Sequence, residues 1–283
     1  MLRFSRLRRF AVLIATLLLA ACGSEPRRAG AQDMSELFLK PAAEHLGRPQ
    51  VLRTPARTFS TSDPARILVI GDSLAQGFGI YLDRRVKERK LAAVVINRGR
   101  TSTGLARSDF YDWPANLAAQ LAELRPDIVV VHFGSNDNQS IVLPGGNVRQ
   151  GSAGWPEAYR AQTQRILDIA AAQPTMVYWI GPAPDRRVSL NAHLTRINPI
   201  FQAEALASSA RYFPLSIFAA GPDGAFVRDV PVNGRMTTIR SGDGSHFTGT
   251  GYYLVADRLL QDMAPLMPSM FNAARLELAG ALQ

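Results

Sequence analysis

The feature that most constrains the fold is an alternation, from residue 64 onward, between short apolar runs and longer segments of helical periodicity. The runs are continuous rather than alternating, as in residues 128–131, which read Ile-Val-Val-Val. Continuous Val- and Ile-rich runs are typical of strands that are buried on both faces. Strands that alternate with helices indicate a parallel sheet covered by helices on both sides.

The sequence therefore predicts an α/β fold of the flavodoxin-like kind: a three-layer α/β/α sandwich with a mostly parallel five-stranded sheet. Pro199 is expected to kink or divide the fourth of its helices, because proline removes a helix hydrogen bond. We expect strands at residues 66–70, 93–97, 127–133, 176–181 and 212–217, and helices at residues 74–90, 114–124, 156–172, 190–210 and 249–263.

Two insertions interrupt this alternation. Residues 138–154 are polar and rich in glycine, and residues 223–242 carry Asn233-Gly234 between two strand-like runs. Asn-Gly favours a two-residue type I′ turn, so the second insertion is predicted to hold a β-hairpin. In an open parallel sheet the loops beyond the carboxyl ends of the strands form the binding crevice. The first insertion is therefore expected to overhang the third strand, and the second leads into residues 243–246.

The N-terminus resembles an export signal followed by a lipid anchor. A basic stretch, Arg3 to Arg9, precedes an apolar stretch at residues 10–21 that is too short to span a bilayer comfortably. Cys22, the only cysteine, follows Leu-Ala-Ala as in the lipobox of bacterial lipoproteins, where the cysteine becomes the lipidated first residue. Several acyl chains on one residue would hold the protein to a membrane. Gly23 stands where an inner-membrane retention signal would usually have Asp, so the resemblance favours the periplasmic face of the outer membrane as the location. The alternative is a plain secretory signal.

These signals divide the chain into four parts. Residues 1–21 are the expected signal peptide, and residues 22–62, rich in Pro, Arg, Ala and Ser, are the expected tether. A short helix is expected in the tether at residues 34–39. The folded domain is expected at residues 63–275, with a short tail at residues 276–283.

The charge of the chain gives little support for a nucleic-acid partner. The formal net charge is +9, but residues 1–21 contain four arginines and no acidic residue. Without them, 28 basic residues face 23 acidic ones, a charge of +5, and there is no run of five or six like charges. A mild, dispersed bias of this kind argues against nucleic-acid binding.

Three short motifs carry the residues of a hydrolytic site. Residues 71–77, Gly-Asp-Ser-Leu-Ala-Gln-Gly, follow the first predicted strand, and residues 134–137, Gly-Ser-Asn-Asp, follow the third. Residues 243–246, Asp-Gly-Ser-His, precede the last predicted helix. Because the carboxyl ends of parallel strands lie at one edge of the sheet, the first two motifs are expected to be neighbours.

The three motifs supply a nucleophile, a base and an orienting carboxylate. A serine hydroxyl is a poor nucleophile until a base takes its proton, so we assign Ser73 as the nucleophile and His246 as the general base. Asp243 can accept the Nδ1–H of His246, which fixes the tautomer and stabilises the imidazolium. The remaining histidines are expected elsewhere, with His45 near the tether, His132 in the core and His193 on a helix surface.

Together and in this order, the motifs resemble those of the SGNH hydrolases, also called the GDSL family of esterases and acyl transferases. The resemblance covers roughly residues 65–265. It implies an oxyanion hole made by the backbone N–H of Ser73 and the side-chain N–H of Asn136. It also implies an acyl-serine intermediate.

The turn after the second strand departs from the pattern of the family, which has a glycine there whose N–H is the third oxyanion donor. Residues 97–105 read Asn-Arg-Gly-Arg-Thr-Ser-Thr-Gly-Leu. We prefer Gly104 as the donor. Gly99 is the second choice, and strict spacing from Asn97 points to Ser102.

The resemblance and the export signal together lead us to expect a serine esterase that acts on short O-acyl groups, above all O-acetyl groups, of cell-envelope glycans. The alternatives are a glycan O-acyltransferase with the same triad, a lipase or thioesterase, and a catalytically silent glycan-binding envelope protein. The expected partners are an acylated glycan or another small ester, and the membrane through the lipid anchor. No cofactor is expected, and the sequence has neither a His-x-x-x-His pair nor a cysteine cluster to bind a metal.

Other polar and aromatic residues near the predicted crevice receive structural roles. We expect Tyr111, Trp113 and Trp155 to belong to the core. Arg186 and Arg187 are expected to be a solvated surface pair rather than a grip on an acidic substrate group. Asp137 is expected to shape the polar site.

Overall fold

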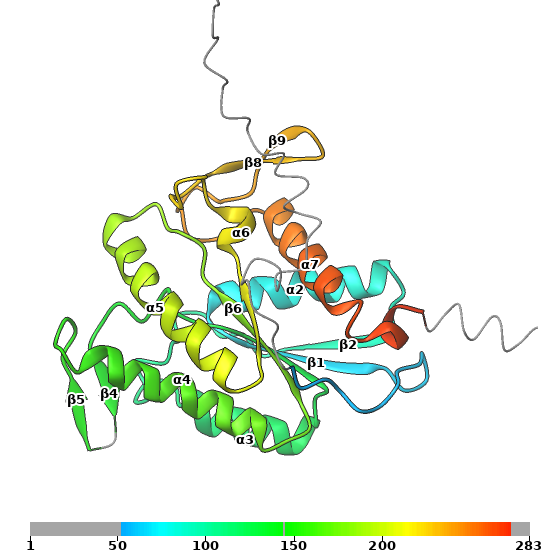
Figure 1. The fold of residues 1–283 in the computed structure, drawn as a ribbon, viewed down its shortest axis with the longest axis horizontal. Helices are drawn as coiled ribbons and strands as arrows, with labels where there is room; N and C mark the ends of the chain where they lie inside the picture. Colours follow the sequence, from blue (N-terminus) through cyan, green and yellow to red (C-terminus); the bar gives the residue numbers. More distant parts are fainter. Residues whose placement is uncertain (1–51, 144, 273–283) are drawn as a thin grey trace, which may run out of the picture. The chain divides into compact units, whose positions relative to one another are not determined.

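The continuous apolar runs form a five-stranded parallel sheet in the order β2-β1-β3-β6-β7 (Figure 1). The computed structural model describes residues 52–143 and 145–272, which all fall within one unit of the chain, Asp33–Gln283. The sheet confirms the predicted α/β fold, with all four strand pairings parallel. Its strands are β1 (Ala65–Gly71), β2 (Ala93–Asn97), β3 (Ile128–His132), β6 (Met176–Gly181) and β7 (Arg211–Pro214).

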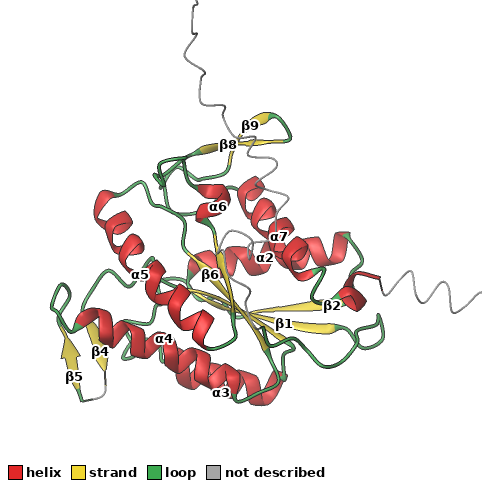
Figure 2. Ribbon diagram, viewed as in Figure 1, coloured by secondary structure: helices red, strands yellow, loops and turns green. Residues whose placement is uncertain are grey.

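Helices cover both faces of the sheet, as Figure 2 shows. One face carries α2 (Ser73–Glu88) and α7 (Gly249–Met263), which pack against each other. The other face carries α3 (Trp113–Leu124), α4 (Trp155–Ala171) and α5 (Val188–Ala207). No helix within the described residues is long and apolar enough to cross a membrane.

The two cores follow from the pleat of the strands, because successive side chains point to opposite faces. In β1, Ile67 and Val69 belong to the core under α2 and α7, whereas Leu68 and Ile70 belong to the core under α3, α4 and α5. All four side chains are fully buried. A strand with two buried faces has no place for alternating polar residues, which explains the continuous apolar run.

The strand order places a topological switch point between β1 and β3. From β1 the chain crosses to one side to form β2, then returns past β1 to form β3 on the other side. In doubly wound sheets of this order, ligands bind outside the carboxyl ends of the strands at this point. Gly71 ends β1 and His132 ends β3, so the segments that follow them meet there.

Both insertions contain short hairpins. In the second, β8 (Asp229–Val232) pairs antiparallel with β9 (Arg235–Thr238). The turn has φ values of 49° at Asn233 and 75° at Gly234, both left-handed as a type I′ turn requires. This confirms the predicted hairpin. The first insertion holds a hairpin that its glycine-rich sequence did not predict, β4 (Ile141–Leu143) with β5 (Gly146–Val148).

Two elements differ from expectation. Helix α5 runs through Pro199, which is exposed, so the proline does not divide the helix, one of the two outcomes expected. Water can solvate the carbonyl that loses its partner there, so the helix tolerates the proline. The last strand ends at Pro214, and the apolar residues that follow form the short helix α6 (Ser216–Ala219) instead.

Residues 52–62, the end of the expected tether, contact the folded domain. Phe59 is buried in the core beside α2 and α7, and the Nε of Arg57 lies 2.7 Å from Oδ1 of Asp127. The packed region therefore starts before the boundary predicted at residue 63. The signal peptide, Cys22, His45, the helix expected at residues 34–39 and the C-terminal tail lie outside the described residues.

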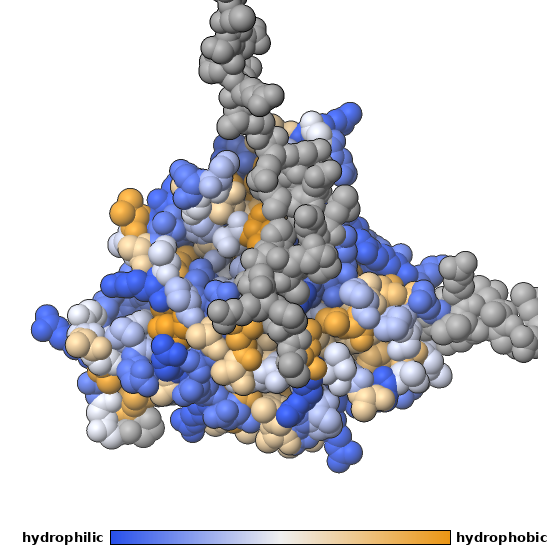
Figure 3. Space-filling model, viewed as in Figure 1, coloured by the Kyte–Doolittle hydropathy of each residue, from blue (hydrophilic) through white to orange (hydrophobic). Residues whose placement is uncertain are grey.

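The surface is mixed in character. Figure 3 shows hydrophilic and hydrophobic residues interspersed on the described part of one face. The exposed large apolar side chains are few, and they come from α2, β2, the loop before α3, the two ends of α5, and β9. They are Ile80, Val94, Phe110, Val188, Leu206 and Met236.

Candidate active site

Ser73 stands at the first position of α2, two residues after the end of β1. Gly71 has a φ of 133°, and a Cβ built on it would lie 1.9 Å from the carbonyl oxygen of His132. Only glycine therefore fits at the end of β1. Asp72 then caps the helix, because its Oδ1 accepts the N–H groups of Leu74 at 2.9 Å and Ala75 at 3.4 Å. These two residues aim the Ser73 hydroxyl out of the carboxyl edge of the sheet.

The structure brings Ser73, His246 and Asp243 into one chain of hydrogen bonds. Ser73 Oγ lies 2.8 Å from Nε2 of His246. On the other side of the ring, Nδ1–H of His246 donates to Oδ2 of Asp243 at 2.6 Å. In this arrangement the neutral imidazole accepts the serine proton while the carboxylate fixes its tautomer. The geometry is that of an activated serine nucleophile.

The Asp243 carboxylate uses both of its oxygens. While Oδ2 binds the imidazole, Oδ1 accepts the backbone N–H groups of Ser245 at 2.9 Å and His246 at 3.0 Å, and the hydroxyl of Ser241 at 2.6 Å. Burial acts to raise the pKa of Asp243, but these bonds together with the one from His246 outweigh it and hold the pKa well below its usual range. Asp243 therefore stays ionised and oriented.

Asn136 lies in the turn that follows β3. It follows Gly134, whose φ of 128° turns the chain out of the strand. The Nδ2 of Asn136 donates one hydrogen bond to the carbonyl oxygen of Thr103 at 2.9 Å. An amide nitrogen carries two hydrogens, so a second N–H is left for an oxyanion.

Comparison with known proteins places this site in a family. The model of a family described as "Protein of unknown function (DUF459)" matches residues 66–262, more than half of the chain. The chain belongs to the DUF459 family. No curated protein matches the sequence.

Solved structures show that this DUF459 family member has the fold of the SGNH hydrolases. A GDSL-like lipase from Bacteroides thetaiotaomicron is 16% identical, with a TM-score of 0.52 over 82% of this chain and 98% of that one. An aryl esterase from M. smegmatis is also 16% identical, with a TM-score of 0.52 over 71% of this chain and 99% of that one. At this identity the likeness establishes the fold, and the chemistry must be argued from the site.

The three alternatives for the third oxyanion donor occupy different surroundings. Ser102 is exposed and has a left-handed φ of 62°, the conformation for which a glycine is usual. Gly104 is buried, and a Cβ on it would lie 2.1 Å from Oδ1 of Asp137. Gly99 packs against the backbone of Gln76, and a Cβ on Gly99 would lie 2.4 Å from the backbone nitrogen of Gln76. The assignment of the donor among these three remains a prediction.

The buried carboxylate of Asp137 joins this turn to the end of β3. Its Oδ1 accepts the N–H of Ala106 at 2.8 Å and its Oδ2 accepts the hydroxyl of Tyr159 at 2.8 Å. Burial raises the pKa of Asp137 to about 6, against the lowering effect of these bonds. Burial likewise raises the pKa of Asp72 to about 7. Both acids therefore brace the backbone beneath the site rather than facing the solvent.

The remaining histidines and aromatic residues are largely structural. His132 is fully buried and its Nδ1–H donates to the carbonyl of Ile180 at 2.9 Å, as expected of a core histidine. The expectation for His193 is wrong: its side chain is 1% exposed and its ring meets that of Trp155 edge-on at 5.5 Å. Helix α5 turns this residue inward, toward α4. Trp113 and Trp155 are buried, which confirms their core role.

Arg186 and Arg187 are both exposed, as expected of a solvated pair. Arg187 also donates to Oδ1 of Asp185 and, at 2.7 Å, to the hydroxyl of Ser245 in the histidine loop. Asp185, Ser245 and the buried Arg240 support that loop, and sequence reasoning missed all three. The available signal was the position of Ser245 within the Asp-x-x-His motif and of Arg240 three residues before it.

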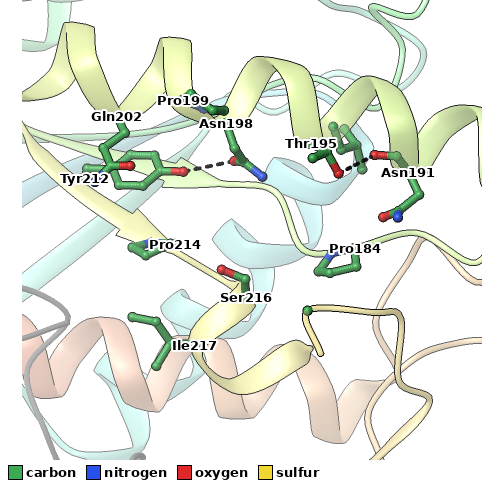
Figure 4. Close-up of a pocket in the computed structure, with 12 residues that line it drawn as sticks. Pro184, Asn191, Thr195, Asn198, Pro199, Gln202, Tyr212, Pro214, Ser216 and Ile217 are labelled. Atoms are coloured by element: carbon green, nitrogen blue, oxygen red, sulfur yellow. Dashed lines mark hydrogen bonds between the residues drawn. The ribbon is translucent and has the colours of Figure 1, made fainter. Parts of the chain in front are cut away.

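A pocket of about 440 Å³ opens along the same edge of the sheet, beyond the carboxyl ends of β6 and β7 (Figure 4). It lies between α5 and the segment that follows β7. Tyr212 donates its hydroxyl to Asn198 at 2.9 Å on one wall. Pro184 also lines the pocket, and its carbonyl accepts a hydrogen bond from Arg240. The lining residues are uncharged and include Asn191, Gln202 and Ser216.

Proposed function

We propose that this DUF459 family member is a serine ester hydrolase that works through an acyl-serine intermediate on Ser73. The observation that carries the proposal is the unbroken chain from Ser73 Oγ through the imidazole of His246 to the carboxylate of Asp243, at 2.8 Å and 2.6 Å. Residues from opposite ends of the domain meet here, at the switch point of the sheet.

The reaction follows from this geometry. Ser73 Oγ attacks the ester carbonyl carbon while Nε2 of His246 takes its proton, and the carbonyl oxygen becomes an oxyanion that the Ser73 and Asn136 N–H groups stabilise. The intermediate collapses, and the leaving alcohol takes the proton from His246. Water then attacks the acyl-serine, again giving its proton to His246, and the acid leaves as Oγ is reprotonated.

The proposed substrate is a short O-acyl ester, above all an O-acetyl ester, of a cell-envelope glycan. A cavity of about 10 Å³ reaches Leu74, the residue after the nucleophile, and is also lined by Ala183 and Arg240. A space of this size holds about one water-sized group, so it offers no room for a long acyl chain. The uncharged pocket beyond β6 and β7 supports a polyhydroxylated, neutral substrate. The expected export of the protein supports a substrate in the envelope.

Hydrolysis of nitrophenyl esters tests the proposal. Wild-type protein should cleave the acetyl ester and lose activity as the acyl chain lengthens, and Ser73→Ala should abolish turnover. Asp243→Asn should lower kcat by about 10⁴-fold, because the imidazole loses its orienting acceptor. Asp109→Asn, an exposed aspartate paired with Arg107, is the matched control and should retain activity.

Labelling with a fluorophosphonate gives a second readout. The reagent should attach to Ser73 in the wild type, as peptide mapping by mass spectrometry would show. Labelling at another serine would contradict the assignment of the nucleophile. Faster cleavage of long-chain esters would contradict the short-acyl substrate and favour a lipase.

We also propose that Cys22 carries a lipid that anchors the protein to a membrane facing the periplasm, more specifically the outer membrane. The support is the sequence alone, the basic and apolar stretches that end in Leu-Ala-Ala-Cys. Mass spectrometry of the mature N-terminus should find an acylated Cys22 as the first residue. A chain cleaved elsewhere, or one with an unmodified Cys22, would contradict the anchor.

A further inference from the structure

A buried arginine lies beneath the loop that carries Asp243 and His246. Arg240 follows β9 by two residues, and only 2% of its surface is exposed. Its guanidinium carbon lies 5.1 Å from the ring centroid of Phe226 and 4.8 Å from that of Phe247. Burial of a cation is costly unless its hydrogen bonds are satisfied.

Both Nη nitrogens of the guanidinium donate to backbone carbonyl oxygens, while its buried Nε has no hydrogen-bond partner among the described residues. Nη1 of Arg240 donates to Pro184 at 2.9 Å, and Nη2 donates to Gly244 and to Ser245, each at 3.0 Å. The first bond ties the loop to the segment after β6. The other two are made to the histidine loop itself.

The two loop carbonyls belong to the peptide groups that hold the catalytic carboxylate. The peptide group with the carbonyl of Gly244 ends in the N–H of Ser245, and the one with the carbonyl of Ser245 ends in the N–H of His246. Both N–H groups donate to Oδ1 of Asp243, at 2.9 Å and 3.0 Å. Because a trans peptide group is planar, with its C=O and N–H pointing in opposite directions, each carbonyl held by Arg240 turns its N–H toward Asp243.

The charge of Arg240 strengthens this arrangement. Burial lowers the pKa of Arg240 to about 10, while the charges of Asp185 and Asp243 act to raise it, so the side chain is a cation at neutral pH. A cation at the carbonyl end of a peptide group polarises it, and the N–H at the other end becomes a better donor. Two polarised peptide groups therefore connect the Arg240 cation to the Asp243 anion.

We propose that Arg240 is a positioning residue of the triad, which orients Asp243 and His246 by holding the two peptide groups whose N–H groups bind the carboxylate. The inference rests on the proposed function, in which these residues activate Ser73. It also gives the second insertion a role, since the hairpin β8–β9 positions Arg240. The backbone N–H of Arg240 donates to the carbonyl of Arg228, just before β8, at 3.2 Å.

Kinetics of three variants test the role. Arg240→Met removes the donors and the charge, and should lower kcat for a nitrophenyl acetyl ester by about 100-fold with little change in KM, the loss typical of a displaced catalytic group. Arg240→Lys keeps a cation and part of the hydrogen bonding, so its kcat should lie between those of Arg240→Met and the wild type. If Arg240→Met folds and keeps the kcat of the wild type, the proposal is wrong.

Arg211→Met is the matched control. Arg211 is also buried, at 4% exposure, and pairs with Asp262, but it begins β7 at the opposite edge of the sheet. This variant should lower Tm and leave kcat unchanged for the folded fraction. A fall in kcat equal to that of Arg240→Met would mean that kcat only follows stability, and would overturn the proposal.

Proton NMR separates this inference from the proposed function. The Nδ1–H of His246, bound to Asp243, should give a low-field resonance that His246→Ala removes. The resonance should shift or vanish in Arg240→Met and persist in Arg211→Met. If it does so while the wild type cleaves no ester, Arg240 still positions the triad and the proposed function fails. An unchanged resonance in Arg240→Met would overturn the positioning role.

Discussion

Two residues in the turn after β2 have opposite requirements for a side chain. Ser102 has a left-handed φ of 62°, which costs an L-residue with a Cβ roughly 1–2 kcal/mol. Gly104 lies against the carboxylate of Asp137, where no Cβ fits. The same turn therefore contains one position that would accept glycine and one that requires it.

These requirements predict a pair of effects on stability. Ser102→Gly should raise the free energy of unfolding by about 1 kcal/mol, because it relieves the left-handed strain. Gly104→Ala should lower it by roughly 1–3 kcal/mol, because the new methyl displaces the Asp137 carboxylate. Urea unfolding measures both, and ester hydrolysis should fall in Gly104→Ala alone.

Full stability and activity in Gly104→Ala would contradict the contact between this turn and Asp137. Loss of activity in Ser102→Gly at unchanged stability would show that the hydroxyl of Ser102 takes part in the reaction. Neither outcome depends on which N–H is the third oxyanion donor, since both variants keep a backbone N–H.

At the scale of elements, sequence patterns located most of the strands and helices because each pattern reflects local physics. The bounds expected for β2, β6 and α7 match the structure, and Asn233-Gly234 located the hairpin turn because few residue pairs accept two left-handed φ values. Periodicity could not tell that residues 215–219 leave the strand, since an apolar segment of that length fits either a strand or a helix.

Pro199 and His193, both in α5, show why a helix cannot be understood from its own sequence. Proline breaks a helix in isolation, yet α5 continues through Pro199, whose exposure lets water bind the carbonyl left without a partner. His193 is polar, yet α5 buries it against Trp155 on α4. The neighbouring helix decided the place of His193, whereas exposure to solvent decided that of Pro199.

At the scale of the whole molecule, buried ionisable groups make stability depend on pH. Burial lowers the pKa of His132 to about 4 from an ordinary 6.5. A histidine whose pKa is lower in the folded state binds a proton more readily when the chain is unfolded, so stability is lost as pH falls from about 6.5 toward 4. Asp72 and Asp137, with raised pKa values, act in the opposite direction over the same range.

Replacing His132 by Asn should remove the contribution of this histidine to the pH dependence of stability. The Asn amide can still donate to the carbonyl of Ile180, but it does not titrate. Between pH 7 and pH 5 the variant should therefore gain on the order of 2 kcal/mol of unfolding free energy relative to the wild type. Chemical denaturation at the two pH values measures the difference. Identical pH dependence in the two proteins would contradict a neutral, buried His132.

The sequence by itself determined the sheet, its helical layers and the identity of Ser73, Asp243, His246 and Asn136 as candidates, because strand periodicity and short motifs are local and survive without the rest of the chain. Only the tertiary structure decided that the Ser73 hydroxyl, the His246 imidazole and the Asp243 carboxylate form hydrogen bonds. It also decided that His193 is buried and that Arg240 binds the loop that carries Asp243. Those facts depend on contacts between residues more than 50 positions apart, such as Ser73 with His246 and Arg240 with the carbonyl of Pro184. Such pairings leave no local pattern, because any residue supplies a carbonyl.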